Sequence, residues 1–317
     1  MKPLINVVWF KRDLRLEDHA ALEQASRENL PVLLLFVFEP SLWKDRHTDL
    51  RHWRFLYESV VNCYRQFRDR GTRLYLFHRE CEEVWMLLAE QFRINTVYSY
   101  EETGLEVTYR RDHRLARWFA DCEISWVEFP CNGVQRRRLN RDGWDKQWKS
   151  QMSQPQHQVD WSGWQGVELD SRWYAEQKGP QLPIGVNQKH SNFQTGGEEH
   201  AQLALHQFLK GGGHGYSRHI SKPLTSPLHT SRLSPYRLTV ACQCGKYGRH
   251  FSRSNIPAIP FELLVLACTG IVTSFKSLRP NQILSSKISI QAILVSPGKT
   301  MSSTCRLGKT GTPVFPW

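Results

Sequence analysis

The chain has 317 residues, of which 40% are hydrophobic and 23% charged, and its formal net charge is +12. A chain of this length can bury a sizeable core and form about two domains. It has no run of 18 apolar residues and no cationic leader followed by an apolar stretch, so we expect a soluble, cytoplasmic protein; we also expect a monomer. Its eight cysteines are unevenly spaced, which favours reduced thiols over a disulfide framework.

The positive charge is concentrated late in the sequence. Residues 1–236 carry 32 Lys and Arg against 29 Asp and Glu, whereas residues 237–317 carry 10 against the single acid Glu262. The basic excess of the whole chain therefore does not by itself indicate a nucleic-acid partner for the first 236 residues.

Residues 1–130 have the pattern of an α/β domain. Amphipathic helical stretches, such as the one ended by Gly71 and another over about 104–120, separate five apolar runs. These runs are residues 5–10, 31–38, 73–77, 96–100 and 123–129. The alternation predicts a five-stranded parallel, Rossmann-like sheet covered by helices on both faces, and such sheets bind ligands at the carboxyl ends of their strands.

A charged stretch, FKRDLRLEDHAAL (residues 10–22), follows the first predicted strand. The chain has neither a G-x-G-x-x-G turn there nor a Walker-type loop anywhere. Two interpretations remain for its alternating charges: a solvated, salt-bridged start of a helix, which we favour, or a phosphate-binding or cofactor-binding edge. The charges are Lys11, Arg12 and Arg15 alternating with Asp13, Glu17 and Asp18.

Residues 131–194 are predicted to be an interdomain linker. From residue 150 onward they show little apolar periodicity and are rich in Gln, Pro, Gly and Ser. We expect the linker to lie along the protein surface. Its aromatic residues are expected to anchor it by packing and not to stack on bases: Trp161, Trp164, Trp173 and Tyr174.

A second domain is predicted to begin near Thr195 with a helix that ends at the three glycines 211–213. Residues 214–236 then combine many hydroxyl groups with Arg218, Lys222 and Arg232. Such a segment suits a pyrophosphate, but it equally suits a Ser/Pro-rich loop with ordinary helix caps, and the residues alone favour neither interpretation.

Several of these segments resemble the DNA photolyase/cryptochrome family. The opening VVWFKRDLRLEDHAAL resembles the family's first strand and helix, from which Lys11 and His19 depart mildly. FPCNGVQRRRLNRDGWDKQW (residues 129–148) resembles the segment that leaves the α/β domain in one bacterial branch. GGEEHAQLALHQFL resembles the beginning of the helical flavin domain, and TSRLSPY (residues 230–236) resembles the flavin-phosphate signature T-S-x-L-S-P, the most specific match. The resemblance covers residues 1–236.

The resemblance implies a cofactor, a substrate and a set of binding residues. Residues 195–236 would be the start of an all-helical FAD-binding domain, and the activity would be light-driven repair of UV-damaged DNA by reduced flavin. An antenna pigment, where present, would lie on the α/β domain. No metal and no membrane are implied, and no catalytic residue is assigned. The residues implied to contact FAD are Tyr216, Thr230, Ser231, Arg232, Leu233 and Ser234.

After Tyr236 the family pattern is lost. If the bases of residues 242–251 (CQCGKYGRHF) are regrouped by one position, the genetic code permits LSMRQVWQAF, an amphipathic helix of the family kind. The same regrouping of residues 268–279 permits LHWHCHFIQKFE, which resembles a flavin-facing helix. We therefore interpret residues 237–317 as an out-of-frame tail without fixed packing, produced by loss of one base, and we regard Cys242, Cys244 and Cys268 as too sparse for a metal site.

Three functional hypotheses follow from the sequence. The chain is a photolyase or cryptochrome that is truncated and inactive as written, a separate α/β module that binds a nucleotide or pigment without repair activity, or a non-functional frameshifted product.

Overall fold

A computed structural model describes residues 1–130, 143, 146–147, 150–151, 153–212, 216–219 and 221–239. The interpretation of residues 240–317 as an out-of-frame tail, and of their cysteines, lies outside the described residues. So does most of the FPCNGVQRRRLNRDGWDKQW segment.

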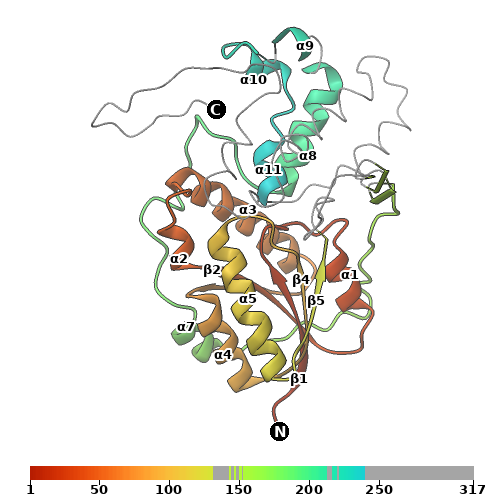
Figure 1. Cartoon of the computed structure of the whole chain (residues 1–317), viewed down its shortest axis with the longest axis vertical. Coiled ribbons are helices and arrows are strands. Elements are labelled where there is room, and N and C mark those ends of the chain that lie inside the picture. Colours follow the sequence, from red (N-terminus) through yellow and green to blue (C-terminus); the bar gives the residue numbers. More distant parts are fainter. Residues whose placement is uncertain are drawn as a thin grey trace.

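The N-terminal domain is built on a five-stranded parallel sheet (Figure 1). Its strand order is β3-β2-β1-β4-β5, with β1 in the centre. The strands are β1 (Leu4–Phe10), β2 (Val32–Phe38), β3 (Leu74–His78), β4 (Arg93–Tyr100) and β5 (Ser125–Phe129). All five lie where the apolar runs predict them, which confirms the predicted parallel α/β domain.

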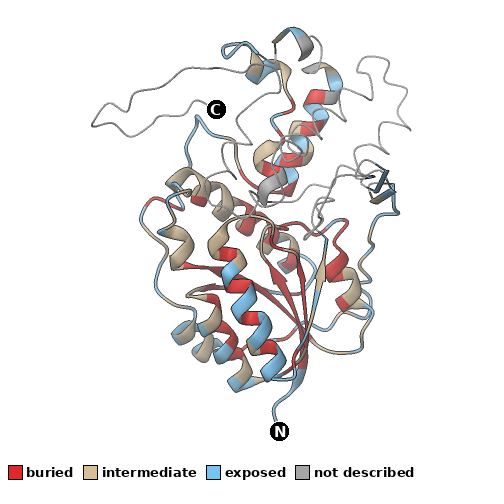
Figure 2. Ribbon diagram, viewed as in Figure 1, coloured by how far each residue is buried: buried red, intermediate tan, exposed pale blue. Residues whose placement is uncertain are grey.

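Helices cover both faces of this sheet (Figures 1 and 2). One face packs against α1 and α3, and the other against α4 and α5. These helices, together with the short α2, are α1 (Ala20–Ser26), α2 (Pro40–Trp43), α3 (Leu50–Arg68), α4 (Cys81–Gln91) and α5 (Glu106–Asp121). The central strands are apolar without alternation because each of their two faces is buried.

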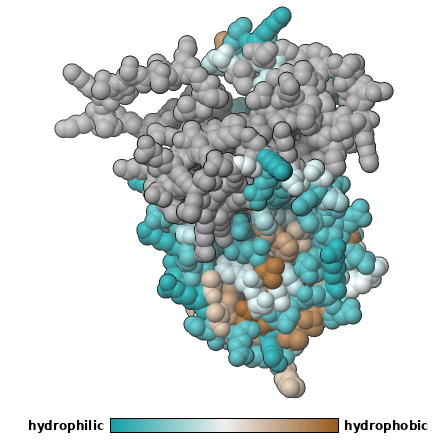
Figure 3. Space-filling view, turned by 45° about the vertical axis from the view of Figure 1, so that its right-hand side comes forward, coloured by the Kyte–Doolittle hydropathy of each residue, from teal (hydrophilic) through white to brown (hydrophobic). Residues whose placement is uncertain are grey.

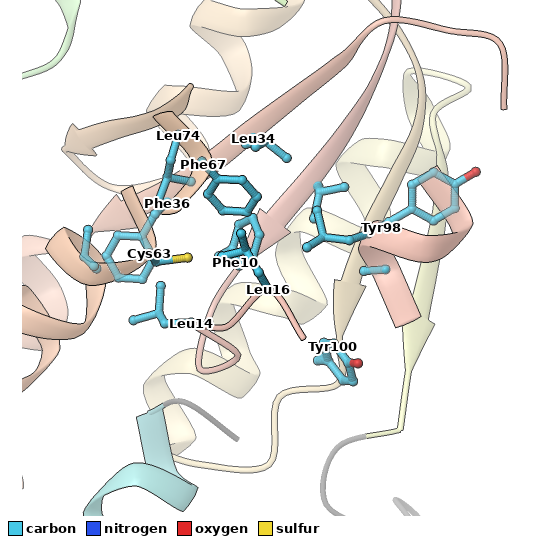
Figure 4. Packing of buried hydrophobic residues seen from close by; sticks show 14 of the residues in the cluster. Phe10, Leu14, Leu16, Leu34, Phe36, Cys63, Phe67, Leu74, Tyr98 and Tyr100 are labelled. Carbon is cyan, nitrogen blue, oxygen red and sulfur yellow. The ribbon is translucent and has the colours of Figure 1, made fainter. Parts of the chain in front are cut away.

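Large aromatic side chains fill both layers of the core. On the α3 face, Phe10 and Phe67 meet edge to face with ring centroids 5.5 Å apart, and Figure 4 shows the two rings next to each other. On the opposite face, Trp9 and Trp85 meet edge to face at 5.6 Å. In Figure 3 the visible face of this domain is mostly hydrophilic, with a smaller apolar area near its centre.

The segment predicted as a linker returns along the α/β domain and contributes to both core layers. Trp161 and Trp164 pack against the α3 side, whereas Trp173 and Tyr174 pack against the opposite side. The packing role expected of these aromatics is confirmed. The segment also contains a helix that the sequence did not predict, α7 (Ser171–Gln177), which is short and begins with Asp170 accepting a bond from the Trp173 amide at 2.8 Å.

Helices also dominate the described residues after Thr195. The predicted helix over residues 195–213 is present as α8 (Glu198–Gln207), followed by η1 (Phe208–Gly212), in which Gly211 has a non-helical backbone (φ 148°). Three short helices follow in the Ser/Pro-rich stretch: α9 (Tyr216–His219), α10 (Ser226–His229) and α11 (Ser234–Thr239). Across the described ranges no helix is both long enough and apolar enough to cross a membrane.

Candidate functional site

Two regions of the described structure could bind a ligand: the carboxyl edge of the sheet and the segment Thr230–Ser234. At the sheet edge, charged residues follow the strands directly, with Lys11 after β1 and Glu39 after β2. Their side chains are 4% exposed in both cases, so this edge is a buried ionic cluster rather than an open charged surface.

Lys11 is held by two carboxylates and two indole rings. Its Nζ lies 2.9 Å from Asp112 and 3.3 Å from Glu128, and 4.4 Å and 4.9 Å from the ring centroids of Trp9 and Trp126. Burial would raise the pKa of Asp112, but Lys11 and the neighbouring arginine on α5 hold it below its ordinary value. The ammonium is thus neutralised within the protein.

Arg111, on α5, is a second buried cation that carboxylates neutralise at this edge. Its guanidinium pairs with Glu39, lies 2.8 Å from Asp112 and 3.7 Å from Glu102. Burial alone would lower the pKa of Arg111, but these carboxylates raise it well above its ordinary value. Burial raises the pKa of Glu39 despite the pairing with Arg111.

The loop after β1 is closed by a second buried pair. His19 Nε2 lies 2.7 Å from Asp13, and Arg15 donates to the Tyr100 hydroxyl at 3.0 Å. The salt-bridged interpretation of residues 10–22 is therefore confirmed, but its solvated character is wrong, because the Asp13 and His19 side chains are 1% and 0% exposed. The ion pairs of the segment are those of Lys11 with Asp112 and of Arg12 with Glu102, so its charges have partners within the protein.

The segment Thr230–Ser234, the second candidate region, is distinguished by its backbone conformation and not by buried ion pairs. Thr230 is extended, Arg232 has a left-handed backbone (φ 49°), and helix α11 starts at Ser234. Ser231 and Leu233 are buried, while the Arg232 side chain is exposed. Successive backbone amides in a turn that contains a left-handed residue can form an anion-binding concavity.

Contacts from the preceding loop hold this segment on α3. Gln194 donates from Nε2 to the Arg232 carbonyl at 2.9 Å, and the Tyr236 hydroxyl donates to the Thr195 carbonyl at 2.8 Å. The Tyr236 ring also packs on Phe55 of α3, with centroids 5.1 Å apart. The sequence alone did not identify Gln194 or Tyr236 as functional, because neither contact leaves a periodic or compositional pattern.

The start of α8 is fixed on α3 by two glycines and a buried acid. A Cβ at Gly196 would come within 2.1 Å of the Phe55 carbonyl, and Gly197 has φ 115°. Glu198 accepts from the Leu16 amide at 3.0 Å, and its own amide donates to Asn62 at 3.1 Å. The two consecutive glycines before Glu198 are the sequence feature that could have predicted this close approach of the two backbones, because only glycine leaves room for it.

Tyr216 lies on α9 with its ring against Phe208 (centroids 6.2 Å apart). Arg218 and Lys222 flank it along the chain, and the sequence contains no acid between Glu199 and Glu262. Hydroxyls, amides and cations without neighbouring carboxylates in the sequence form a donor set that fits the phosphate end of FAD. That the six predicted residues contact one cofactor stays a prediction. Among the described residues, no three His, Cys, Asp or Glu side chains gather in a way that could hold a metal ion.

The sequence was compared with protein families and with curated proteins. Residues 6–135 match the sequence profile of the DNA photolyase family. The N-terminal region of this chain is thus similar to the DNA photolyase/cryptochrome family. Among curated relatives, cryptochrome DASH of Gloeobacter violaceus is 33% identical over 116 residues (35% of this chain and 23% of that protein). Cryptochrome-1 of Anopheles gambiae is 28% identical over 131 residues, which are 39% of this chain and 24% of that protein.

Solved structures of photolyases and cryptochromes share the fold over a longer stretch. The Synechocystis sp. PCC6803 cryptochrome covers 90% of this chain with a TM-score of 0.67 at 16% identity, and a class III photolyase from Agrobacterium tumefaciens covers 89% with a TM-score of 0.67 at 18% identity. The structural match covers 62% of the Synechocystis chain and 60% of the Agrobacterium chain. The sequence matches cover less than a quarter of the length of the two curated relatives named above.

Proposed function

We propose that this chain is the α/β domain and the beginning of the FAD-binding domain of a light-dependent photolyase or cryptochrome. The observation that carries the proposal is the segment Thr230–Ser234, whose sequence matches the flavin-phosphate signature and whose left-handed Arg232 leads into α11. Its hydroxyls and amides would bind the FAD pyrophosphate, with Tyr216 at the same cofactor. FAD, when bound, would supply the light-driven electron that splits a pyrimidine dimer.

We also propose that the chain as written does not complete this site. The family pattern stops after Tyr236, and a flavin site needs most of its ligand buried. We therefore expect no repair activity and weak FAD binding. The mature photolyase fold would instead require the helices encoded in the shifted frame.

The paired charges at the carboxyl edge of the sheet bear on the alternative function. A separate nucleotide-binding module would use this edge, yet Lys11 and Arg111 are already neutralised there by Asp112, Glu39 and Glu102. The structure thus gives more support to the FAD segment than to a ligand site at the sheet edge.

The test compares the chain as written with a chain in which one base is restored just after the codon for Tyr236. Both are purified, and bound flavin is measured from the 450 nm absorbance relative to protein. We expect the restored chain to retain FAD and to repair UV-irradiated DNA in light, while the chain as written is nearly colourless. A near-stoichiometric flavin content in the chain as written would overturn the incompleteness of its site, and a restored chain without flavin would overturn the family function. Sequencing the gene around codon 237 tells a sequencing error from a mutation.

A further inference from the structure

The backbone of Arg232 is in a conformation that L-residues adopt rarely. Its φ is 49°, and the stretch from Thr230 to Ser234 contains no glycine that could adopt this conformation freely. A residue in such a conformation keeps it only when its surroundings hold it there. The contacts around Arg232 must therefore supply that restraint.

Two side chains bracket the strained residue. Gln194 bonds the Arg232 carbonyl itself, at 2.9 Å. Four residues further along, Tyr236 is 3% exposed, its hydroxyl bonds the Thr195 carbonyl at 2.8 Å and its ring lies on Phe55. Both contacts therefore converge on residues 194–195, on one side of the segment.

Residues 194–195 are themselves fixed to the α/β domain. The next residue, Gly196, donates its amide to Glu58 of α3 at 2.7 Å and has no room for a side chain against the Phe55 carbonyl. In Figure 1, α8 and α11 are both drawn above α3. The shape of the segment is thus set by the α/β domain through Gln194 and Tyr236.

We propose that Gln194 and Tyr236 are positioning residues that hold Thr230–Ser234 in its phosphate-binding shape before any ligand arrives. This inference rests on the proposed function for the identity of the ligand, but not for the conformational role itself. Preorganisation of this kind lowers the ordering cost of binding, so Gln194, through the Arg232 carbonyl, and Tyr236, through Thr195 and Phe55, would act on ligand affinity by fixing the shape of the segment.

The test uses the full chain with Gln194→Ala and Tyr236→Phe, and two matched controls. Gln202→Ala removes an exposed α8 amide that lies 3.4 Å from Glu17, and Tyr109→Phe removes a hydroxyl from α5. Hydrogen exchange of peptides covering residues 226–236 is measured together with peptides of strand β1. We expect exchange in residues 226–236 to accelerate roughly threefold to tenfold in each positioning variant, as for loss of one hydrogen bond, with β1 unchanged. The controls should exchange like the parent chain.

A double-mutant cycle separates positioning from simple loss of packing. In an Arg232→Gly background the left-handed conformation is no longer strained, so Gln194→Ala should accelerate exchange less than it does in the parent. Equal effects in both backgrounds, or unchanged exchange in both single variants, would overturn the proposal. If Tyr236→Phe also accelerates exchange in β1, that variant destabilises the α/β domain as a whole. The proposal is then tested by the Gln194→Ala cycle alone.

FAD is then added as a probe and its binding is followed by flavin fluorescence. Where the parent binds FAD, each positioning variant should bind it roughly threefold to tenfold more weakly. If neither the parent nor the frame-restored chain binds FAD, the proposed function fails, while the exchange data still decide whether Gln194 and Tyr236 shape the segment.

Discussion

The buried His19 caps the N-terminus of α1 and also pairs with Asp13. Its Nδ1 accepts the Leu22 amide at 3.1 Å as the helix N-cap, and its Nε2 faces the Asp13 carboxylate at 2.7 Å. Both contacts are satisfied only by the neutral ring with its proton on Nε2. Burial lowers the pKa of His19 even though Asp13 opposes the shift, in agreement with that geometry.

Replacing His19 is expected to destabilise the α/β domain in a graded way. His19→Ala removes the cap and leaves the buried Asp13 without this partner, at a cost of about 2–4 kcal/mol. His19→Asn keeps a capping oxygen and should cost about half as much. Urea denaturation at pH 7.5 measures both, and equal losses would contradict a capping role for the ring.

The same geometry predicts a pH dependence. Because the folded-state pKa of His19 lies below its ordinary value of 6.5, the unfolded chain takes up a proton below pH 6.5 that the folded chain excludes. Neutral His19 therefore makes its full contribution to the free energy of unfolding above pH 6.5, and this contribution is lost as the pH falls below 6.5. Between pH 6.5 and 5 the unfolding free energy of the parent should decrease more steeply than that of His19→Asn, by up to about 1.4 kcal/mol per pH unit. Parallel profiles in urea titrations would show that folding does not lower the pKa of His19.

At the scale of elements, the edge strand β3 is covered by the segment 164–180. The Tyr174 hydroxyl accepts from the Leu76 amide at 3.0 Å and donates to the Leu76 carbonyl at 2.8 Å. The His78 amide donates to the Lys178 carbonyl at 2.7 Å. An uncovered edge strand presents free backbone groups to other chains, so this segment protects the sheet from edge-to-edge association.

Tyr174→Phe tests that protection. The variant keeps the ring packed on Tyr75 and Phe77 but loses both bonds to Leu76, so we expect a loss of about 1–2 kcal/mol in the free energy of unfolding. Light scattering at 37 °C should show faster aggregation than in the parent or in Tyr109→Phe. An unchanged aggregation rate together with the expected loss of stability would mean that the edge is protected by the rest of the segment.

The elements differ in how far the sequence predicted them, and the reason is physical. Strands β1 to β5 and helices α3 to α5 carry their own apolar patterns, because each buries a continuous face. Helix α7 and the short helices α9 to α11 were missed, since they are too short for periodicity and depend on residues distant in sequence, as Tyr236 does on Thr195. For the same reason the sequence pointed to Thr230–Ser234 through a motif but could not identify Gln194.

At the scale of the whole molecule, the helical region rests on the α/β domain through contacts of Leu233, Tyr236 and the 194–195 loop. Leu233 and Tyr236 are buried at 3% exposure each, and the segment is bonded to residues 194 and 195. We therefore expect the α/β domain and residues 195–239 to form one folding unit.

Truncation tests this at two positions. A chain of residues 1–239 keeps every contact just described, so its thermal midpoint should lie within about 3 °C of that of the full chain. A chain of residues 1–228 loses Leu233, Tyr236 and both bonds to the 194–195 loop. Burial of two large side chains is worth roughly 3–6 kcal/mol, and 1 kcal/mol corresponds to about 2–4 °C in a protein of this size, so its midpoint should fall by about 6 °C or more. A large drop already in the 1–239 chain would show that residues after 239 pack on this unit, and would also remove the basis for interpreting them as an out-of-frame tail.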